Sequence, residues 1–441
     1  MKNLKIVFCL LIACCAFQYS FAQNPLVPHK ISLKNGASFN LNLPAEYEII
    51  PAAEGLKRVR FFAAAPDGRI FVTDMHDLTD NKKGAVYILQ DFNRETGKFA
   101  RVVPYLTNLK NPNSAAFYTD ANGQDWFYLA ETDKLTRRPY RRLESAEAPV
   151  PRRAAPNEDQ SAAPAIFRTI KWELPLFSLE GWFGARRKNP PLIVADERPQ
   201  ILATFPDYGL SYKYGGWHLT RTIAFAPGGK LYVSVGSSCN ACEEKEKVRA
   251  TVLEMNADGS NQRVFAKGLR NAVGLKWIEN NLFATNQGSD HLGLNKPDET
   301  FYALKNNADY GWASCYQSSG RIFADAEHKR LKSCANVPKS YAFFPAHSSA
   351  MGFDYFNGTT SDDLIKNSFL VALHGSTNKD LAKGYRVVIV RKDKRLQDFI
   401  SGFLQNKKVV GRPCDIMRLD ENSFLFTDDH SGVVYLVRQK R

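Results

Sequence analysis

The sequence predicts an all-β fold, from its length, its apolar content and the way its apolar residues alternate. The chain has 441 residues, 44% of them hydrophobic, with 28 glycines and 22 prolines. Such a chain is too apolar to remain disordered, and it is long enough for a large core or two to three domains. Short alternating segments bounded by turn residues recur along it, without a sustained helical period.

One segment pattern recurs six times and predicts how the strands are organised. Each copy has an apolar pair, a polar turn and an alternating segment, which predicts two strands joined by a hairpin. The copies begin at Phe61, Ala115, Ile223, Gly274, Gly352 and Asp415. Their even spread favours one six-bladed β-propeller over two separate all-β domains. We expect Leu41–Ile50 to close the ring against the last blade.

The stretch Lys134–Pro190 interrupts this pattern and is predicted to be a Pro/Arg-rich insertion between blades. Its first part has the composition of a linker. Residues 166–188 combine aromatic and apolar residues with a basic cluster, Arg186, Arg187 and Lys188. Such a segment either packs on the propeller rim or contacts a membrane surface or a partner.

The net charge of +14 is concentrated in two segments. Lys134–Pro190 holds 12 Lys and Arg against 6 Asp and Glu, and Lys366–Arg441 holds 15 against 8. The rest of the chain is nearly neutral, so we expect no nucleic-acid partner. The charge in the last blades instead suits a small anionic ligand.

Residues 1–22 are predicted to be a signal peptide, leaving residues 23–441 as a single propeller. Lys2 and Lys5 precede an apolar run that is too short for a membrane span, and small residues end the segment at Ala22. We therefore expect an exported protein, periplasmic or secreted. The alternative is that Leu11–Cys14 is a lipobox and that Cys14 is a lipid anchor.

Export leaves five of the eight cysteines in an oxidising space. Cys239 and Cys242 form a C-x-x-C motif, which suits a redox pair, a zinc half-site or a short disulfide. No second such motif completes a zinc site, so a disulfide is the favoured interpretation. Cys315 and Cys334 are expected to form a second disulfide, with Cys414 as a buried thiol.

Residues suited to catalysis gather in the loops beside the predicted strands. Five of the eight histidines lie in these loops: His218, His291, His347, His374 and His430. A loop histidine can act as a base at neutral pH. Arg270 and Arg412 can bind carboxylates or phosphates, and the Asp298-Glu299 pair offers oxygen ligands for calcium. The sequence has no dinucleotide-binding, P-loop, G-x-S-x-G or H-E-x-x-H motif, which disfavours a nicotinamide enzyme.

Several motifs, taken in order, resemble the glucose/sorbosone dehydrogenase family, and most closely its sorbosone-dehydrogenase-like branch. They are W-H-L-T-R-T-I-A-F from Trp217, G-L-R-N-A-V-G-L from Gly268, P-D-E-T from Pro297, D-Y-G-W from Asp309 and V-A-L-H-G-S-T-N-K from Val371. Members of this family are six-bladed propeller quinoproteins, soluble aldose sugar dehydrogenases that use pyrroloquinoline quinone (PQQ) and calcium. The resemblance covers nearly the whole mature chain outside Lys134–Pro190.

The resemblance implies a PQQ-dependent dehydrogenase that oxidises an aldose or a related carbonyl sugar by hydride transfer to the quinone. His218 matches the general base of the family. The cofactor-binding positions correspond to Arg270, Asn271 and Arg412, with either His374 or Lys379 as a further cationic group. Expected partners are a small sugar and a soluble or membrane-linked electron acceptor, with possible peripheral membrane contact through residues 166–188.

The resemblance also implies two calcium sites. Carbonyl oxygens near Gly288 and Ser289 would hold calcium at the cofactor, and Glu299 with the Tyr310 carbonyl would hold a structural calcium. Two positions depart from better-known soluble glucose dehydrogenases: Val273 replaces a glutamine, and Cys414 replaces a second arginine. Cofactor affinity and substrate therefore stay open.

Two other functions are compatible with a propeller. One is a calcium-dependent lactonase or other hydrolase, in which histidine and carboxylates activate water. The other is a non-catalytic propeller that binds a glycan or a partner. Arg270 together with Arg412 favours the dehydrogenase, because a lactonase has little use for two cations directed at a planar trianion.

Overall fold

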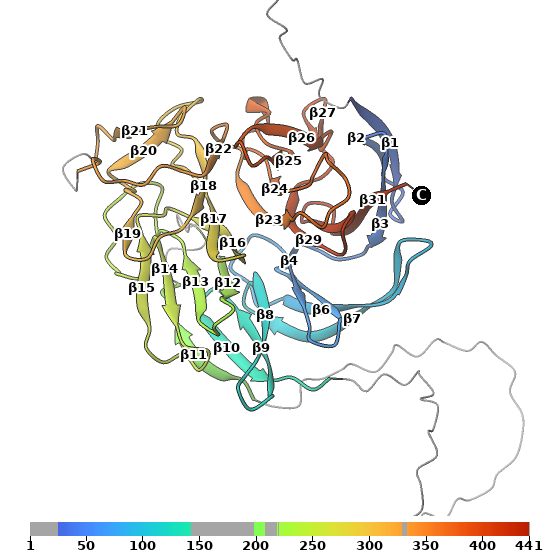
Figure 1. Ribbon diagram of the computed structural model, residues 1–441, viewed down its shortest axis with the longest axis horizontal. Coiled ribbons are helices and arrows are strands. Elements are labelled where there is room, and N and C mark those ends of the chain that lie inside the picture. Colours follow the sequence, from blue (N-terminus) through green and yellow to red (C-terminus); the bar gives the residue numbers. More distant parts are fainter. Residues whose placement is uncertain (1–24, 143–197, 208–217, 219, 329–332, 441) are drawn as a thin grey trace, which may run out of the picture.

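Six antiparallel β-sheets surround a central axis in the computed structural model of the protein (Figure 1). This is the expected six-bladed propeller. The structure describes residues 25–142, 198–207, 218, 220–328 and 333–440. The predicted signal peptide, the alternative lipid anchor at Cys14 and the predicted membrane-contact segment 166–188 lie outside the described residues.

The first three blades follow one another along the chain. Blade 1 contains β4 (Val59–Ala64), β5 (Ile70–Asp74), β6 (Gly84–Asn93) and β7 (Lys98–Leu109). Blade 2 contains β8 (Ser114–Thr119), β9 (Asp125–Ala130), β10 (Lys134–Pro139) and β11 (Gln200–Thr204). Blade 3 contains β12 (Arg221–Phe225), β13 (Leu231–Val235), β14 (Thr251–Met255) and β15 (Arg263–Lys267), to which β19 (Ala308–Asp309) adds in parallel.

The last three blades complete the ring. Blade 4 contains β16 (Ala272–Ile278), β17 (Asn281–Asn286), β18 (Glu299–Ala303) and β22 (Ala342–Phe344). Blade 5 contains β23 (Ala350–Phe356), β24 (Ser368–Leu373), β25 (Arg386–Val390) and β26 (Leu396–Ile400). Blade 6 contains β29 (Pro413–Arg418), β30 (Ser423–Asp428), β31 (Val433–Gln439) and the N-terminal strand β3 (Tyr47–Ala53).

Each of the six predicted hairpins forms the first two strands of a blade. The first strands β4, β8, β12, β16, β23 and β29 contact one another around the axis. Their side chains are mostly buried, as in β12, where Arg221 to Ala224 are buried and only Phe225 is half-buried, because both faces pack against neighbouring blades. The outer strands β7, β11 and β26 contain more exposed and half-buried residues.

The ring closes by pairing the two ends of the chain. Strand β3 runs antiparallel to β31, with Tyr47 opposite Gln439 and Ala53 opposite Val434. The expected closing segment, Leu41–Ile50, therefore covers only part of the strand that performs this role. Leu41 belongs instead to β2 (Ser38–Pro44), which pairs with β1 (Leu26–Ser32) in a separate hairpin.

The interruption of the repeat lies inside blade 2, not between blades as predicted. Lys134–Pro139, the first residues of the predicted insertion, form β10, the third strand of that blade. The fourth strand, β11, pairs with β10 after the interruption. The two arginines of this strand gave it the composition of a linker. In the structure Leu135 and Thr136 are buried, and Arg137 stacks on Trp126 with 4.1 Å between its guanidinium carbon and the ring centroid.

Three smaller elements lie outside the blades. The hairpin of β20 (Cys315–Ser318) and β21 (Arg321–Ala324) projects beside blade 4 (Figure 1). A second hairpin joins β27 (Leu404–Gln405) to β28 (Lys408–Val409). The 3-10 helix η2 (Lys379–Leu381) follows β24. Among the described residues, no helix is both long and apolar enough to cross a bilayer.

The hydrophobic core is divided into clusters between adjacent blades. Val59, Phe62 and Val72 of blade 1, for example, pack against Leu425 and Leu436 of blade 6. Each fully buried aliphatic or aromatic side chain contributes about 1.5–3 kcal/mol to folding. Because every blade shares its core with two neighbours, the blades hold the axial loops in fixed positions.

The cysteines behave as the sequence predicted. Cys239 and Cys242 form one disulfide, and Cys315 and Cys334 form another. Cys414 is a free thiol that is fully buried. The C-x-x-C motif is therefore a cross-link within the loop after β13 in this structure.

Candidate active site

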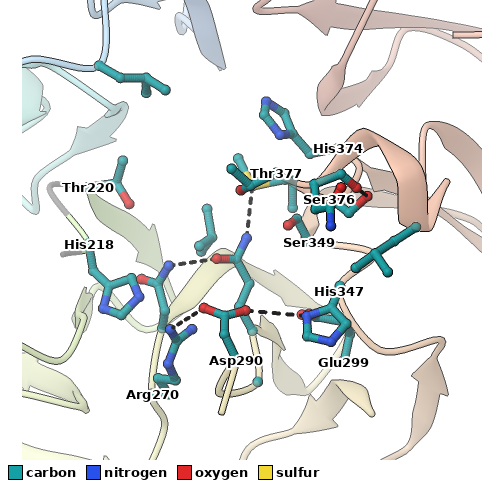
Figure 2. A pocket seen from close by; sticks show the side chains of 18 of the residues that line it. His218, Thr220, Arg270, Asp290, Glu299, His347, Ser349, His374, Ser376 and Thr377 are labelled. Carbon is teal, nitrogen blue, oxygen red and sulfur yellow. Dashed lines mark hydrogen bonds and ion pairs between the residues drawn. The ribbon is translucent and has the colours of Figure 1, made fainter. Parts of the chain in front are cut away.

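A cavity of about 580 Å³ opens where the first strands of the blades begin and their second strands end. Its walls come from blades 1, 3, 4 and 5, and the lining includes Arg60, Met75, His218, Thr220, Arg270, Asn271, Gln287, Asp290, Glu299, His347, His374 and Ser376. Ligand pockets typically have volumes of about 300–1,000 Å³. Figure 2 shows His218 and His374 on opposite sides of this space, with Arg270 and Asp290 between them along one wall.

His218 is held with its Nδ1 atom toward the protein. Nδ1 lies 3.0 Å from the Ser237 carbonyl oxygen and 2.9 Å from Ser237 Oγ, whose own hydrogen is donated to the Cys239 carbonyl. Both neighbours of Nδ1 are therefore acceptors, so Nδ1 bears the proton and Nε2 has the lone pair. Burial, and then the nearby Arg270, hold the pKa of His218 well below its usual range. A neutral imidazole of this tautomer can accept a proton at Nε2.

The backbone that presents His218 is fixed by Arg221 at the start of β12. The Arg221 guanidinium donates to the carbonyl oxygens of His218 at 2.9 Å, Thr220 at 3.0 Å and Pro206 at 3.2 Å. His218 itself has a φ of 59°, in the left-handed region that side chains other than glycine rarely adopt. Buried hydrogen bonds to a charged group stabilise this conformation.

Arg270 and Asn271, immediately before β16, both line the cavity. Arg270 is 4% exposed and donates to Asn240 from Nε and Nη2, each at 2.9 Å, and Nη2 also lies 3.3 Å from Asp290 Oδ2. Asn271 donates from Nδ2 to Gln287 Oε1 at 2.9 Å. These contacts hold the guanidinium and the amide at one wall of the cavity.

Asp290 and His347 connect this wall to the loop before blade 5. His347 Nδ1 lies 3.3 Å from Asp290 Oδ1, and its Nε2 lies 2.9 Å from the Gly293 carbonyl (Figure 2). Asp290 thus lies between a cationic side chain, Arg270, and an imidazole. The sequence offered no reason to prefer Asp290 over other loop acids.

Glu299, at the start of β18, points into the same cavity. It is 4% exposed, and its Oε2 atom has no hydrogen-bond partner among the described residues. Burial raises the pKa of Glu299 to about 8, against the opposing effect of Arg270. A half-satisfied buried carboxylate is a suitable ligand for a hard cation.

The other predicted calcium ligands are divided between two cavities. Gly288 lines both the large cavity and a small one of about 30 Å³ behind it, whereas Ser289 and Tyr310 line only the small one. Ser289 Oγ accepts a hydrogen bond from Trp312 Nε1 at 3.1 Å. Glu299 and Tyr310, which were predicted to share one calcium, therefore line different cavities. Gly288 borders both, together with Arg270 and Gln287.

His374 lines the cavity, whereas Lys379 and Arg412 do not reach it. Lys379 is an exposed residue of η2. Arg412 supports the loop after β24, donating from Nη1 to Gly375 at 2.7 Å and from Nη2 to Ser376 at 3.1 Å, both carbonyl oxygens. The expectation that Arg412 faces the ligand is therefore corrected: its guanidinium is used to hold backbone, and it positions His374.

Arg60, which no sequence motif indicated, is a second buried arginine of the cavity wall. It lies in β4, is 4% exposed, and contacts Asp429 Oδ2 at 2.5 Å through Nη1. Asp429 also contacts His374 Nε2 at 2.7 Å and Arg58 Nη1 at 3.2 Å. Although burial opposes it, the His374 imidazole and then Arg60 and Arg58 hold the pKa of Asp429 well below its usual range.

Cys414, which replaces the second arginine of better-known soluble glucose dehydrogenases, is buried close to Arg60. Burial raises the pKa of this thiol, so it is uncharged. Arg60 supplies a cation from another blade to the same cavity. One feature of the sequence could have indicated Arg60. The segment Arg58-Val59-Arg60 places two arginines directly before an apolar run.

A ring of six sheets with a cationic, histidine-bearing cavity on its axis defines a six-bladed β-propeller with an axial ligand site. The TrAA12-like family, the group of the AA12 pyrroloquinoline-quinone dehydrogenases, matches residues 208–439, and the chain belongs to this family. That match includes His218, Arg270, Glu299 and His374.

Solved structures from fungi and bacteria have the same fold. The holo PQQ domain of pyranose dehydrogenase from Coprinopsis cinerea is 17% identical, with a TM-score of 0.62 over 93% of this chain and 98% of that chain. The calcium structure of a Trichoderma reesei family AA12 enzyme is 14% identical, with a TM-score of 0.63 over 95% of this chain and 98% of that chain. PQQ-bound aldose sugar dehydrogenase from Streptomyces coelicolor is 15% identical, with a TM-score of 0.54 over 90% of this chain and 100% of that chain.

An uncharacterised protein of Borreliella burgdorferi is 29% identical over 218 residues. This match covers 47% of the present chain and 57% of the relative, so it spans little more than half of that protein.

Proposed function

We propose that this protein is a PQQ-dependent sugar dehydrogenase that oxidises an aldose or a related carbonyl sugar. The observation that carries the proposal is a neutral His218, with its Nδ1 proton held by Ser237, on the wall of a cavity that also contains two buried arginines. Membership of the TrAA12-like family supports it. The solved structures named above support the fold that this activity needs.

His218 is proposed to remove the hydroxyl proton of the substrate. Oxidation of a sugar C–OH group to a carbonyl releases one proton from oxygen and one hydride from carbon. The Nε2 lone pair of His218 takes the proton, and the Nδ1 hydrogen bonds stabilise the imidazolium that results. PQQ, when bound, would supply the two-electron acceptor for the hydride.

Arg270, Asn271, Arg60 and His374 are proposed to hold the cofactor. PQQ is a flat trianion, so a site for it needs fixed cations and amide donors in a cavity of sufficient size. Arg270 and Asn271 lie on one wall, and the Arg60–Asp429–His374 network lies across the cavity. The donor set therefore fits the group.

Calcium is proposed to bind at the same wall, through Glu299 and the backbone carbonyl of Gly288, which line the large cavity together. The unpartnered Glu299 Oε2 atom in the described structure supports this assignment. Calcium beside the cofactor would increase its electrophilicity. Tyr310 borders the small cavity instead, where its aromatic ring packs in an apolar cluster.

Absorbance spectroscopy tests the proposal directly. Tag-free protein is mixed with PQQ and calcium, freed of unbound cofactor, and then exposed to a panel of aldoses. We expect a stoichiometric bound chromophore whose spectrum changes to that of the reduced quinone when a sugar is added. Failure to retain PQQ, or retention without reduction by any sugar in the panel, would contradict the proposal.

We also propose that the protein works in an oxidising compartment, as expected for an exported periplasmic or secreted protein. Two disulfides support this, because such bonds are rare in reducing compartments. The electron acceptor and any membrane contact through residues 166–188 remain expectations from the sequence.

A further inference from the structure

Two histidines and a glutamate gather beside the cavity, in a place that the proposed dehydrogenase chemistry does not use. His291 lies in the loop between β17 and β18, and Glu327 and His328 follow β21. One ligand atom from each of the three side chains lies within 4.8 Å of the others. The cavity lining described above includes Asp290, the neighbour of His291, but none of these three residues.

The orientation of His291 is the informative feature. Its Nε2 atom lies 2.7 Å from Asp325 Oδ2. Asp325 is 2% exposed and is fixed through its backbone nitrogen, which donates to the Ser314 carbonyl at 2.7 Å. A carboxylate accepts hydrogen bonds, so Nε2 bears the proton and Nδ1 has the lone pair. Nδ1 is buried and has no hydrogen-bond partner among the described residues.

This arrangement is the one that metal-binding histidines adopt in proteins. A ligating imidazole almost always donates its other N–H to a carboxylate or carbonyl, which fixes the tautomer and directs the lone pair at the metal. The His328 ring lies edge-on to His291, with 5.9 Å between centroids. Asp325 Oδ1 accepts from the Glu327 backbone nitrogen at 2.9 Å, which ties the second half of the cluster to the same carboxylate.

We propose that His291, His328 and Glu327 bind a divalent transition-metal ion of the zinc class, with Asp325 as the orienting carboxylate. Two imidazoles and one carboxylate suit zinc and its neighbours, whereas calcium prefers oxygen ligands alone. Ligands bound at about 2.0–2.2 Å from zinc lie roughly 3.4 Å apart, so small side-chain rotations complete the site. A water molecule would fill the fourth position.

The site joins two parts of the molecule that are distant in sequence. His291 belongs to the loop that contributes Asp290 to the cavity, where Asp290 contacts Arg270. Glu327 and His328 extend from the β20–β21 hairpin, which the Cys315–Cys334 disulfide tethers. A bound ion therefore fixes the cavity loop to this hairpin.

A zinc titration tests the site without relying on enzyme activity. Tag-free protein is stripped with a chelator, saturated with calcium to fill oxygen-ligand sites, and titrated with zinc against a chromophoric chelator. We expect one tightly bound zinc per chain. His328→Gln should weaken binding about 100-fold or more, and Asp325→Asn about 10–100-fold, because it removes only the orienting group. His430→Gln, which removes an exposed histidine outside the cluster, should leave zinc affinity unchanged.

Two further measurements separate zinc binding from a folding defect. Cobalt added to the wild-type protein should give the intense visible absorption of a four-coordinate site, and zinc should abolish it. Zinc should raise the Tm of wild-type protein but not that of His328→Gln. The proposal is overturned if wild-type protein takes up no stoichiometric zinc, or if folded His328→Gln binds zinc as tightly as wild type.

Discussion

Ser237 determines which tautomer the neutral His218 adopts, and therefore which ring nitrogen can accept a proton. Both Ser237 atoms near Nδ1 are acceptors, so the basic nitrogen is Nε2. The sequence predicted His218 from its motif, but it gave no tautomer, because the partner lies nineteen residues away across β12 and β13.

His218→Gln should lower kcat by about 10²–10⁴-fold, since general-base catalysis typically contributes that much. The Kd for PQQ should stay within about threefold of wild type, because the imidazole acts on the substrate. Steady-state kinetics and cofactor titration of the same preparation measure both quantities. Unchanged sugar oxidation by the variant would refute the role of His218.

The pH dependence of kcat/KM follows from the environment of His218. Burial and Arg270 lower its pKa, so the imidazole remains neutral and basic below its ordinary value of 6.5. As the pH falls, the acid limb of the profile should therefore appear well below pH 6.5 rather than near it. An acid limb at or above pH 6.5 would show that another group, or a solvated histidine, is the base.

Arg270→Gln should raise the Kd for PQQ by roughly 10–100-fold, since hydrogen bonds to a charged group contribute about 1.5–3 kcal/mol. Lys379→Gln is the matched control, because it removes an exposed cation near the cavity that does not line it. Fluorescence or absorbance titration measures the Kd for PQQ of both variants. Equal losses in the two variants would indicate a non-specific effect of net charge.

The predictable site residues share one property: they lie in loops that follow or precede recognisable strands. His218, Arg270, Asn271 and His374 were found in this way. Arg60 was not, because it lies within strand β4, and strand arginines usually face solvent. Whether a strand residue reaches the axis depends on its register, which the sequence did not give.

At the level of single elements, the inner hairpins were predictable and the outer strands were not. Inner strands pack on both faces, so they form short apolar runs ended by turn residues. Outer strands such as β7 have a mixed pattern (KFARVVPYLTNL) with many exposed side chains, which resembles a loop. A similar mixed pattern is the reason why β10 was assigned to the predicted insertion.

Gly274 in β16 provides a test of inner-strand packing. A Cβ atom there would lie 2.3 Å from the Met351 carbonyl oxygen of the adjacent blade. Gly274→Ala should therefore destabilise the protein by about 1–3 kcal/mol through overpacking. Gly228→Ala is the control, because a Cβ there meets nothing within 4 Å. Urea unfolding of the two variants compares them, and equal midpoints would contradict the packing argument.

On the scale of the whole molecule, Asp429 links three blades at the axis. It follows β30 of blade 6 and contacts Arg58 and Arg60 of blade 1 and His374 of blade 5. Its carboxylate is fully buried. Loss of this charge would leave buried cations facing one another.

Asp429→Asn should destabilise the protein by about 3–5 kcal/mol, the usual result of breaking a buried ion pair. The lowered pKa means that wild-type protein has this stabilisation above the unfolded-state pKa of about 3.9 and loses it as the pH falls further. The variant should therefore differ most from wild type near neutral pH. Asp393→Asn, at an exposed pair with Arg395, should change stability by less than about 1 kcal/mol.

The pairing of β3 with β31 has a consequence for how the protein is made. Tyr47–Ala53 leaves the ribosome long before its partner Val433–Gln439, because five blades and most of the sixth separate them in the sequence. At roughly 5–20 residues per second, β3 waits on the order of 20–80 s for that partner. During this time its edge is open to association with other chains. Nascent chains stalled within blade 6 should therefore be the aggregation-prone species, and a holdase that covers the β3 edge should increase the yield of folded protein.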